Sequence, residues 1–289
     1  MYVDRVHVKK AFAEYTAAYN ADDPKIKLKI DHTYRVAALC ERIAKAAGMC
    51  AYDVELAWLS GMLHDVGRFE QIKRYNTFSD ADSVDHAKFG ADLLFKDGLI
   101  STFLKGMVKC TGYKPGALED RYDSDGVFLY DRLNKSDMEM LELAIRCHNM
   151  YRIPQGLNRR EQAFCNVLRD ADKVDIFKVN IDTPLEEIYN TTTEELMKSD
   201  ITDEVLKAFD EEHCILKAIR RTPADTVIGH VSLAYELVYD ESVRITVEQG
   251  YLAKLMHFHS DNEETNRKMA MVREKMDSYV KKRIGEKDA

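Results

Sequence analysis

Apolar positions along most of this chain recur every three or four residues, which is the period of an amphipathic helix. The clearest case is residues 32–47, HTYRVAALCERIAKAA. The apolar stripe of this segment consists of Val36, Leu39, Cys40, Ile43 and Ala47. Asp31 is the expected N-cap, and Gly48 follows the helix as a C-terminal glycine.

Two more segments in the first third of the chain have the same period. Residues 54–64, VELAWLSGMLH, predict a helix behind Asp53. Its small residues Ala57, Ser60 and Gly61 form a face where another helix can approach closely. The segment VDHAKFGADLLF predicts a third helix, capped by Ser83 and ending before Gly98.

Capping patterns predict where helices begin in the rest of the chain. Ser136 and Glu139 have capping-box spacing at the start of SDMEMLELAIRCH, and Asn158 and Glu161 have it before a helix that includes Asp172. We expect four more amphipathic helices from about residue 200 onward, one of them with Pro223 at its first position. Only TVEQGYL and DGVFLY suggest strands, and weakly. The sequence therefore predicts an all-α fold.

Residues 97–135 are the least regular part of the chain. They mix Gly, Pro, Asp and Tyr, and they predict a loop-rich insert that can act as a lid. The tyrosines and basic residues of the insert that could cover a substrate are Tyr113, Lys114, Arg121 and Tyr122.

Composition and charge narrow the class of protein. Apolar residues make up 45% of the 289 residues, which is enough for a full core, and five prolines and thirteen glycines favour helices over a turn-rich β fold. The net charge of −8 argues against broad binding to nucleic acid or to anionic membranes. No apolar run approaches the roughly 18 residues that span a bilayer, and MYVDRVHVKKAFAEY is too charged for a signal peptide. We therefore expect a cytoplasmic protein. Its six scattered cysteines, without a CxxC, are interpreted as small core residues.

Titratable residues stand at inward-facing positions on five of the predicted helices. His32 is four residues before Val36, and His64 is three after Gly61. The other positions of this kind are His86, His148 and Asp172, and Asp65 follows His64 directly. Neutral imidazoles and carboxylates are ligands for Mn, Fe, Co, Ni or Zn, and Asp65 is placed to bridge two ions.

A single inward histidine is more often a hydrogen-bonded core residue than a ligand. For the joint pattern, that explanation has to hold separately on five helices, which favours a metal site. The remaining histidines lack such a pattern and are interpreted as structural: His7, His213, His230, His257 and His259. Cys147 and Cys165 lie near the candidate ligands, but core packing explains them adequately.

The order of these residues resembles the H…HD…H…H…D signature of the HD-domain superfamily of metal-dependent phosphohydrolases. HTYRVA, GMLHDVGR, VDHAKFGADLL and ADKVD are similar to the flanks of the family's motifs, over roughly residues 28–180. The resemblance implies an all-α core of five or more helices. We expect an HD domain over residues 1–180 and a helical extension over 181–289, packed on the core or on a second subunit as a homodimer.

The resemblance also implies which residues bind metal. Members with one ion use the positions of His32, His64, Asp65 and Asp172. Members with two ions add those of His86 and His148, with Asp65 as the bridge. This chain has CHN at residues 147–149 where some members have two adjacent histidines, so only His148 is carried over. The GYP signature of cyclic-di-GMP hydrolases is not visible.

The first functional hypothesis is hydrolysis of a phosphate ester or anhydride, with a nucleotide expected as the small-molecule substrate. One or two divalent ions, Mg included, would activate a water. Asp65, His86 and Arg68 are the expected catalytic residues, and His86 would be a general acid or base if one ion binds. Arg35, Arg68 and Lys173 are the expected substrate-binding residues. Arg74 is a weaker candidate.

Two alternatives stay open at this point. The same six ligands resemble those of the di-iron oxygenases that share this fold, and the ligands alone do not separate the two reactions. A sensor that binds a nucleotide without turnover is the other alternative. The complete ligand set argues against the sensor, because a degenerate site usually loses some ligands.

Overall fold

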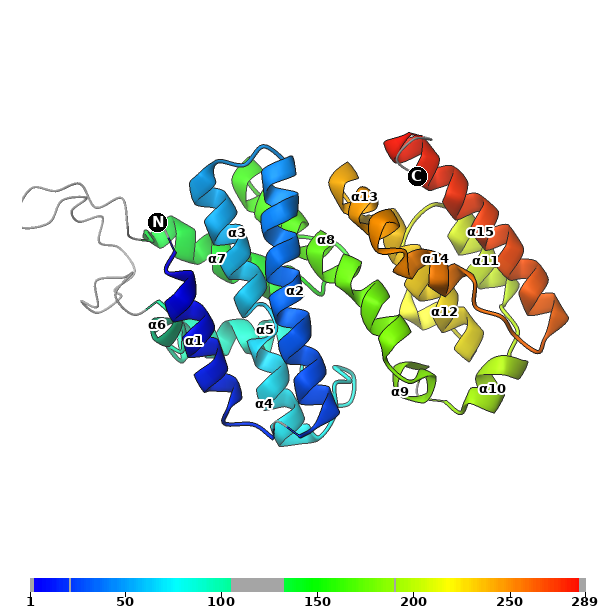
Figure 1. The fold of residues 1–289 in the computed structure, drawn as a ribbon, viewed down its shortest axis with the longest axis horizontal. Helices are drawn as coiled ribbons and strands as arrows, with labels where there is room; N and C mark the ends of the chain where they lie inside the picture. Colours follow the sequence, from blue (N-terminus) through cyan, green and yellow to red (C-terminus); the bar gives the residue numbers. More distant parts are fainter. Residues whose placement is uncertain (1–2, 21, 105–132, 190, 286–289) are drawn as a thin grey trace, which may run out of the picture. The chain divides into compact units, whose positions relative to one another are not determined.

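All the regular elements in the described part of the chain are helices, as predicted. The computed structural model describes residues 3–20, 22–104, 133–189 and 191–285, and no strand occurs in these ranges (Figure 1). The segment TVEQGYL lies in helices, and DGVFLY lies outside the described residues. The chain divides into two compact units, residues 1–169 and 170–289. The division falls inside one long helix, α8 (Arg159–Asp182), which also contains the boundary expected near residue 180. The functional division into an HD domain and an extension stays a prediction.

Helix α2 (Pro24–Ala46) is longer than the sequence pattern predicted. Its N-cap is Asp23, whose side chain accepts a hydrogen bond from the Lys25 N–H, so the prediction that Asp31 is the N-cap was wrong. Residues 25–30, KIKLKI, alternate apolar and polar residues, which hides the helical period. The extra turns place His32 in the interior of the helix, where its backbone is fixed on both sides. Gly48, with φ +73°, follows the end of the helix as predicted.

Helix α3 (Ala51–Leu63) packs against α2, and Gly61 of the predicted small-residue face lies at the contact. A Cβ atom on Gly61 would lie 2.6 Å from the Ala37 Cα and 3.1 Å from the Cys40 Sγ. The backbones of the two helices therefore touch at this position. This contact fixes the spacing between His32 on α2 and His64, the C-cap residue of α3.

We expect Gly61→Ala to destabilise the first unit by about 1–3 kcal/mol, because the added methyl must push the two helices apart. A urea titration of the full chain, followed by circular dichroism, measures the change. Gly90→Ala is the matched control, because its Cβ would meet its nearest atom at 3.0 Å and needs a smaller shift. Equal losses in the two variants would contradict the close-contact explanation.

Two predicted helix starts in the first unit were wrong by two residues. Helix α5 (His86–Ala91) is capped by Asp85, which accepts from the Lys88 N–H, and not by Ser83. Helix α7 (Lys135–Cys147) is capped by Asn134 in a reciprocal box with Asp137, and not by Ser136. Each segment offers several polar residues at capping spacing, and tertiary contacts select among them. The box between Asn158 and Glu161 at the start of α8 was predicted correctly.

Four further helical segments belong to the first unit. Helix α4 (Val66–Tyr75) follows α3 directly, and α5 continues into a π-helical turn, η1 (Asp92–Lys96), and then α6 (Ile100–Phe103). Helix α1 (Arg5–Thr16) makes polar contacts with α2, α3 and α4. Its Arg5 pairs with Glu41 and Glu55, and its Tyr15 hydroxyl donates to the Val66 carbonyl at 2.9 Å.

The second unit consists of short helices and one long one (Figure 1). The elements after α8 are α9 (Leu185–Tyr189), α10 (Thr193–Lys198), α11 (Asp203–Asp210), η2 (Lys217–Ile219), α12 (Pro223–Val231), η3 (Ser232–Glu236), α13 (Asp240–Gln249), α14 (Tyr251–Met256) and α15 (Glu263–Ile284). Pro223 stands at the first position of α12 behind the N-cap Thr222, as predicted. Five α-helices follow residue 200 in the described residues, one more than expected, because Gly250 with φ +68° separates α13 from α14.

Candidate metal centre

Four histidines and one aspartate of the first unit gather at a single buried point. His32 lies on α2, His64 ends α3, His86 begins α5 and His148 ends α7. Asp65 stands between α3 and α4. All five residues are at most 4% exposed. The inward orientation predicted for these side chains is therefore observed.

Asp65 divides this cluster into two halves. Its Oδ2 atom lies 3.5 Å from the Nε2 atoms of both His32 and His64. Its Oδ1 atom lies 3.6 Å from His86 Nε2 and 3.8 Å from His148 Nε2. Within the halves, the two Nε2 atoms are 3.3 Å apart for His32 and His64, and 3.1 Å apart for His86 and His148. Each carboxylate oxygen thus faces its own pair of imidazoles.

The other ring nitrogen of three of these histidines meets a hydrogen-bond acceptor. His64 Nδ1 and His148 Nδ1 lie 2.8 Å and 2.7 Å from the backbone carbonyl three residues before each. His86 Nδ1 lies 2.7 Å from Asp80 Oδ2. Because a carbonyl or carboxylate only accepts, the proton of each neutral ring sits on Nδ1. The Nε2 lone pairs therefore face the cluster.

This arrangement fits metal ions better than it fits a hydrogen-bonded core. Unprotonated nitrogens 3.1 Å apart, such as those of His86 and His148, repel each other without a cation. Asp65 Oδ1 is buried without a hydrogen-bond partner, although Asp65 occupies the N-cap position of α4. First-row ions bind histidine at about 2.0–2.1 Å, so two ligands of one ion lie roughly 3.0–3.4 Å apart. The observed Nε2 separations are in that range.

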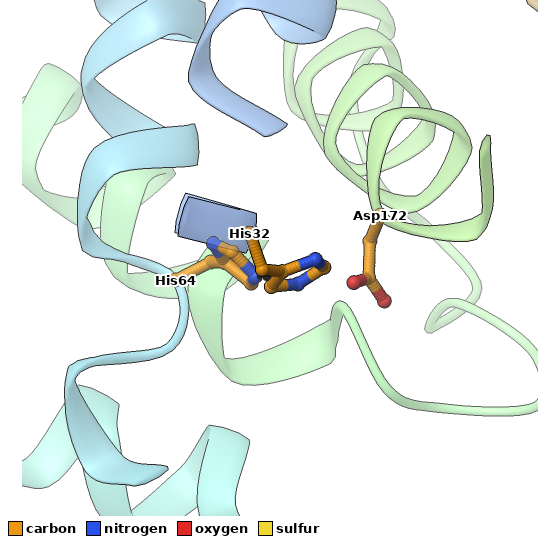
Figure 2. Close-up of side chains that lie close together, drawn as sticks. All are labelled: His32, His64 and Asp172. Atoms are coloured by element: carbon orange, nitrogen blue, oxygen red, sulfur yellow. Dashed lines mark hydrogen bonds between the residues drawn. The ribbon is translucent and has the colours of Figure 1, made fainter. Parts of the chain in front are cut away.

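Asp172 lies on α8, three residues beyond the division between the two units. The ligand atoms of His32, His64 and Asp172 all lie within 4.8 Å of one another (Figure 2). His64, Asp65 and His148 form a second group of this kind. The five predicted ligands of the first unit therefore meet around Asp65, and the ligand role of Asp172 stays a prediction.

The charges around Asp65 keep the ligands in the forms that bind metal. Burial raises the pKa of the Asp65 carboxyl, but Lys29 and the other cationic groups around it hold that pKa well below its usual value. The Lys29 Nζ lies 2.7 Å from Asp65 Oδ2. Burial lowers the pKa of His86 to about 4. At neutral pH the aspartate is therefore charged and His86 is neutral, as metal ligation requires.

Arg68 has more partners than the sequence suggested. Its Nη1 donates to Gln71, to the Phe78 carbonyl and to Asp80 at 2.7–2.9 Å. Its Nε is buried without a hydrogen-bond partner, 3.8 Å from Asp65 Oδ1. The guanidinium is thus anchored beside the cluster, and its predicted role toward a phosphate stays a prediction.

The other predicted substrate contacts remain predictions as well. Arg35 is half-buried and lies three residues after His32 on α2, and Lys173 is buried directly after Asp172 on α8. Arg74 instead pairs with Glu70 at 2.9 Å. The residues predicted to cover a substrate from the insert, Tyr113, Lys114, Arg121 and Tyr122, lie outside the described residues.

Sequence reasoning missed two residues that contact the cluster directly, Lys29 and Asp80. Lys29 is three residues before His32, so a correct start for α2 would have placed both on one helix face. Asp80 lies between α4 and α5, where no periodicity indicates which way a side chain points. Nothing in the sequence alone could have identified it.

The remaining histidines lie outside the groups that can hold an ion in the described part of the chain. His7 and His257 bond to backbone carbonyls, and His213 pairs with Glu211. Burial lowers the pKa of His230 to about 3, so its ring is neutral. These observations agree with the structural interpretation of these residues.

Most of the cysteines also match their interpretation as core residues. Cys40, Cys147, Cys165 and Cys214 are buried free thiols, and burial raises the pKa of Cys165 to about 12. Cys50 differs, because it is exposed at the N-cap of α3. Cys110 lies outside the described residues.

Comparison with known proteins gives one family match. The family model described as HD domain matches residues 30–214, which is more than half of the chain. No curated protein and no solved structure matches the sequence significantly. Among the described residues, no helix has the length and apolar character needed to cross a membrane.

Proposed function

The chain belongs to the HD-domain family of metal-dependent phosphohydrolases, and on this premise we propose that it hydrolyses a phosphate ester or anhydride at a two-ion site. The observation that supports two ions is that the two carboxylate oxygens of Asp65 face different pairs of histidines. His32, His64 and Asp172 would hold one ion with Asp65 Oδ2. His86 and His148 would hold the other with Asp65 Oδ1.

The charge balance of the site supports an anionic substrate. The four histidines are uncharged in the tautomers that bind metal. The cations Lys29 and Arg68 balance the carboxylates Asp65 and Asp80, and the proposed ligand Asp172 adds one negative charge. One or two divalent ions would therefore leave a net positive charge, which attracts a phosphate more strongly than a neutral polyol.

The bound ions would supply an activated water and neutralise charge on the phosphoryl oxygens. The chain itself contributes orientation and proton control. Asp65 is held between two histidine pairs, so both halves of the site keep a fixed separation. If only one ion binds, His86 presents an unprotonated Nε2 at the site and is placed to act as the general base.

A nucleotide is the substrate class we propose. Arg35, Arg68 and Lys173 would contact its phosphates, with Lys29 as an added candidate. Lys29 and Arg68 both lie near the ring of Phe78, at 5.8 and 5.7 Å from its centroid, so an aromatic surface lies between two cations beside the site. A cytoplasmic location and a homodimer remain parts of this proposal.

The test is to purify the full chain without chelator, count its transition metals by elemental analysis and assay phosphate release. Nucleoside mono-, di- and triphosphates would be offered with Mn, Fe, Co, Ni, Zn or Mg. We expect two ions per chain and metal-dependent release of phosphate. No bound metal after supplementation would contradict the proposal. Two irons together with oxygen consumption on a polyol or phosphonate would instead indicate the oxygenase. Nucleotide binding without turnover by the metal-loaded chain would indicate the sensor.

A further inference from the structure

Asp80 contacts the histidine cluster from the segment between α4 and α5, where its Oδ2 lies 2.7 Å from His86 Nδ1. We propose that it is a positioning residue for His86, and that it sets the affinity of the ion held by His86, His148 and Asp65 Oδ1. This inference rests on the proposed function. It adds that the metal affinity of one half of the site can change while the affinity of the other half stays the same.

The orientation of His86 depends on a side chain, whereas that of two neighbours depends on backbone. His64 and His148 each meet the backbone carbonyl three residues earlier in their own helix. Those carbonyls stay in place whatever the nearby side chains are. His86 begins α5 and has no such turn before it, and its Nδ1 meets Asp80 Oδ2 at 2.7 Å instead.

Asp80 is held firmly enough to serve this purpose. Its Oδ1 accepts from Arg68 Nη1 at 2.9 Å and from Gln71 Nε2 at 3.0 Å. Gln71 is fully buried and also donates to Ser83 Oγ and to the Val84 carbonyl. The segment between α4 and α5 is thereby tied to α4, and the Asp80 carboxylate has one stable orientation toward His86.

A different use of Asp80 can be set aside. Asp80, Asp85 and His86 have ligand atoms close enough to suggest an ion site of their own. However, the 2.7 Å between His86 Nδ1 and Asp80 Oδ2 is a hydrogen-bond distance and leaves no room for an ion between the two atoms. Asp85 also caps α5 through the Lys88 N–H. The contact is therefore one that orients a ligand.

A carboxylate behind a histidine fixes its tautomer and makes its other nitrogen a stronger ligand. Removing such a partner typically lowers metal affinity by about 10–100-fold. Asp80 contacts His86, which belongs to one half of the site. The loss of metal affinity should therefore fall on that half. The half with His32 and His64 should keep its affinity.

The experiment is equilibrium binding of Mn²⁺ alone to the full-length protein, with free Mn²⁺ followed by electron paramagnetic resonance. The variants are Asp80→Ala, Asp80→Asn, His86→Ala and the double variant. Asp82→Asn is the matched control, because Asp82 is an exposed carboxylate two residues away. Circular dichroism checks folding. Should Asp80→Ala fail to fold, Asp80→Asn carries the test, because its amide oxygen still accepts from His86.

We expect two ions in the wild type. In Asp80→Ala one of them should bind about 10–100-fold more weakly and the other should be unchanged. Asp80→Asn should show a smaller loss and Asp82→Asn none. Adding Asp80→Ala to His86→Ala should change nothing further, because Asp80 acts through His86.

Three results would overturn the inference. They are an equal loss at both ions, no loss at either ion, and a further loss when Asp80→Ala is added to His86→Ala. Each of these leaves metal binding by the wild type intact, and with it the proposed function. A wild type that binds no Mn²⁺ or other transition ion would instead contradict the proposed function itself.

Discussion

Asp65→Ala should abolish binding of both metal ions and lower kcat by at least about 10³-fold, because the loss of the bound ions removes several kcal/mol of transition-state stabilisation. Asp65 is the residue that both halves of the cluster share, since each of its oxygens faces two imidazole nitrogens. Elemental analysis and phosphate release, measured on the same preparation, check the two expectations together.

Asp65→Asn tests whether the ions depend on the two bridging oxygens of Asp65 or only on a side chain of this shape. The amide keeps one oxygen acceptor, so we expect it to retain at most one ion. Asp82→Asn again serves as the control for loss of a surface charge, and it should keep both ions and full activity. If Asp65→Ala retained two ions with unchanged affinity, Asp65 would not be the bridge and the two-ion proposal would fail.

Asp170→Ala should cause a large loss of stability, about 2–4 kcal/mol, without removing a proposed ligand. Asp170 is fully buried on α8. Its Oδ2 accepts from the N–H groups of Val238 and Tyr239 at 2.9 Å and from the Ser242 hydroxyl at 2.7 Å. These donors lie at the start of α13, and alanine would leave them without an acceptor.

The measurement is urea unfolding of the full chain, followed by circular dichroism. Burial raises the pKa of the Asp170 carboxyl, against the effect of the Tyr239 and Val238 amides, so the charge itself adds little stability. We therefore expect Asp170→Asn, which keeps one acceptor oxygen, to cost less than alanine.

Asp182→Ala is the matched control for this prediction. Asp182 lies on the same helix, but it is half exposed and pairs with Lys178. An exposed ion pair contributes about 0–1 kcal/mol. If Asp170→Ala cost no more than Asp182→Ala, the buried carboxylate would not be what holds the start of α13.

The sequence by itself determined the fold class and the direction of the site residues. The 3.6-residue period assigns each side chain to a face of its helix. An apolar stripe through Val36 therefore also places His32 inward, and the small face of α3 places His64 beside it. For His32, His64, His86 and His148 the burial in the structure agrees with this reasoning, and the ordered HD pattern identified the family that the comparison confirmed.

The tertiary structure decided where helices begin and which contacts complete the site. Asp31, Ser83 and Ser136 are good capping residues, yet Asp23, Asp85 and Asn134 cap the helices instead. Asp, Asn and Ser are nearly equal as caps, and a cap contributes only about 1 kcal/mol, so the packing of neighbouring elements decides between them. Helical periodicity gives no information about a side chain in a loop, which is why Asp80 was not found.

The division of the site into two halves was also decided in three dimensions. A sequence can state that Asp65 follows His64, but it does not state where the two carboxylate oxygens point. Their directions follow from how α3 ends and α4 begins, and from how closely α2 approaches Gly61. Oδ2 faces His32 and His64, and Oδ1 faces His86 and His148, because four helices meet at one point with their backbones already fixed by packing.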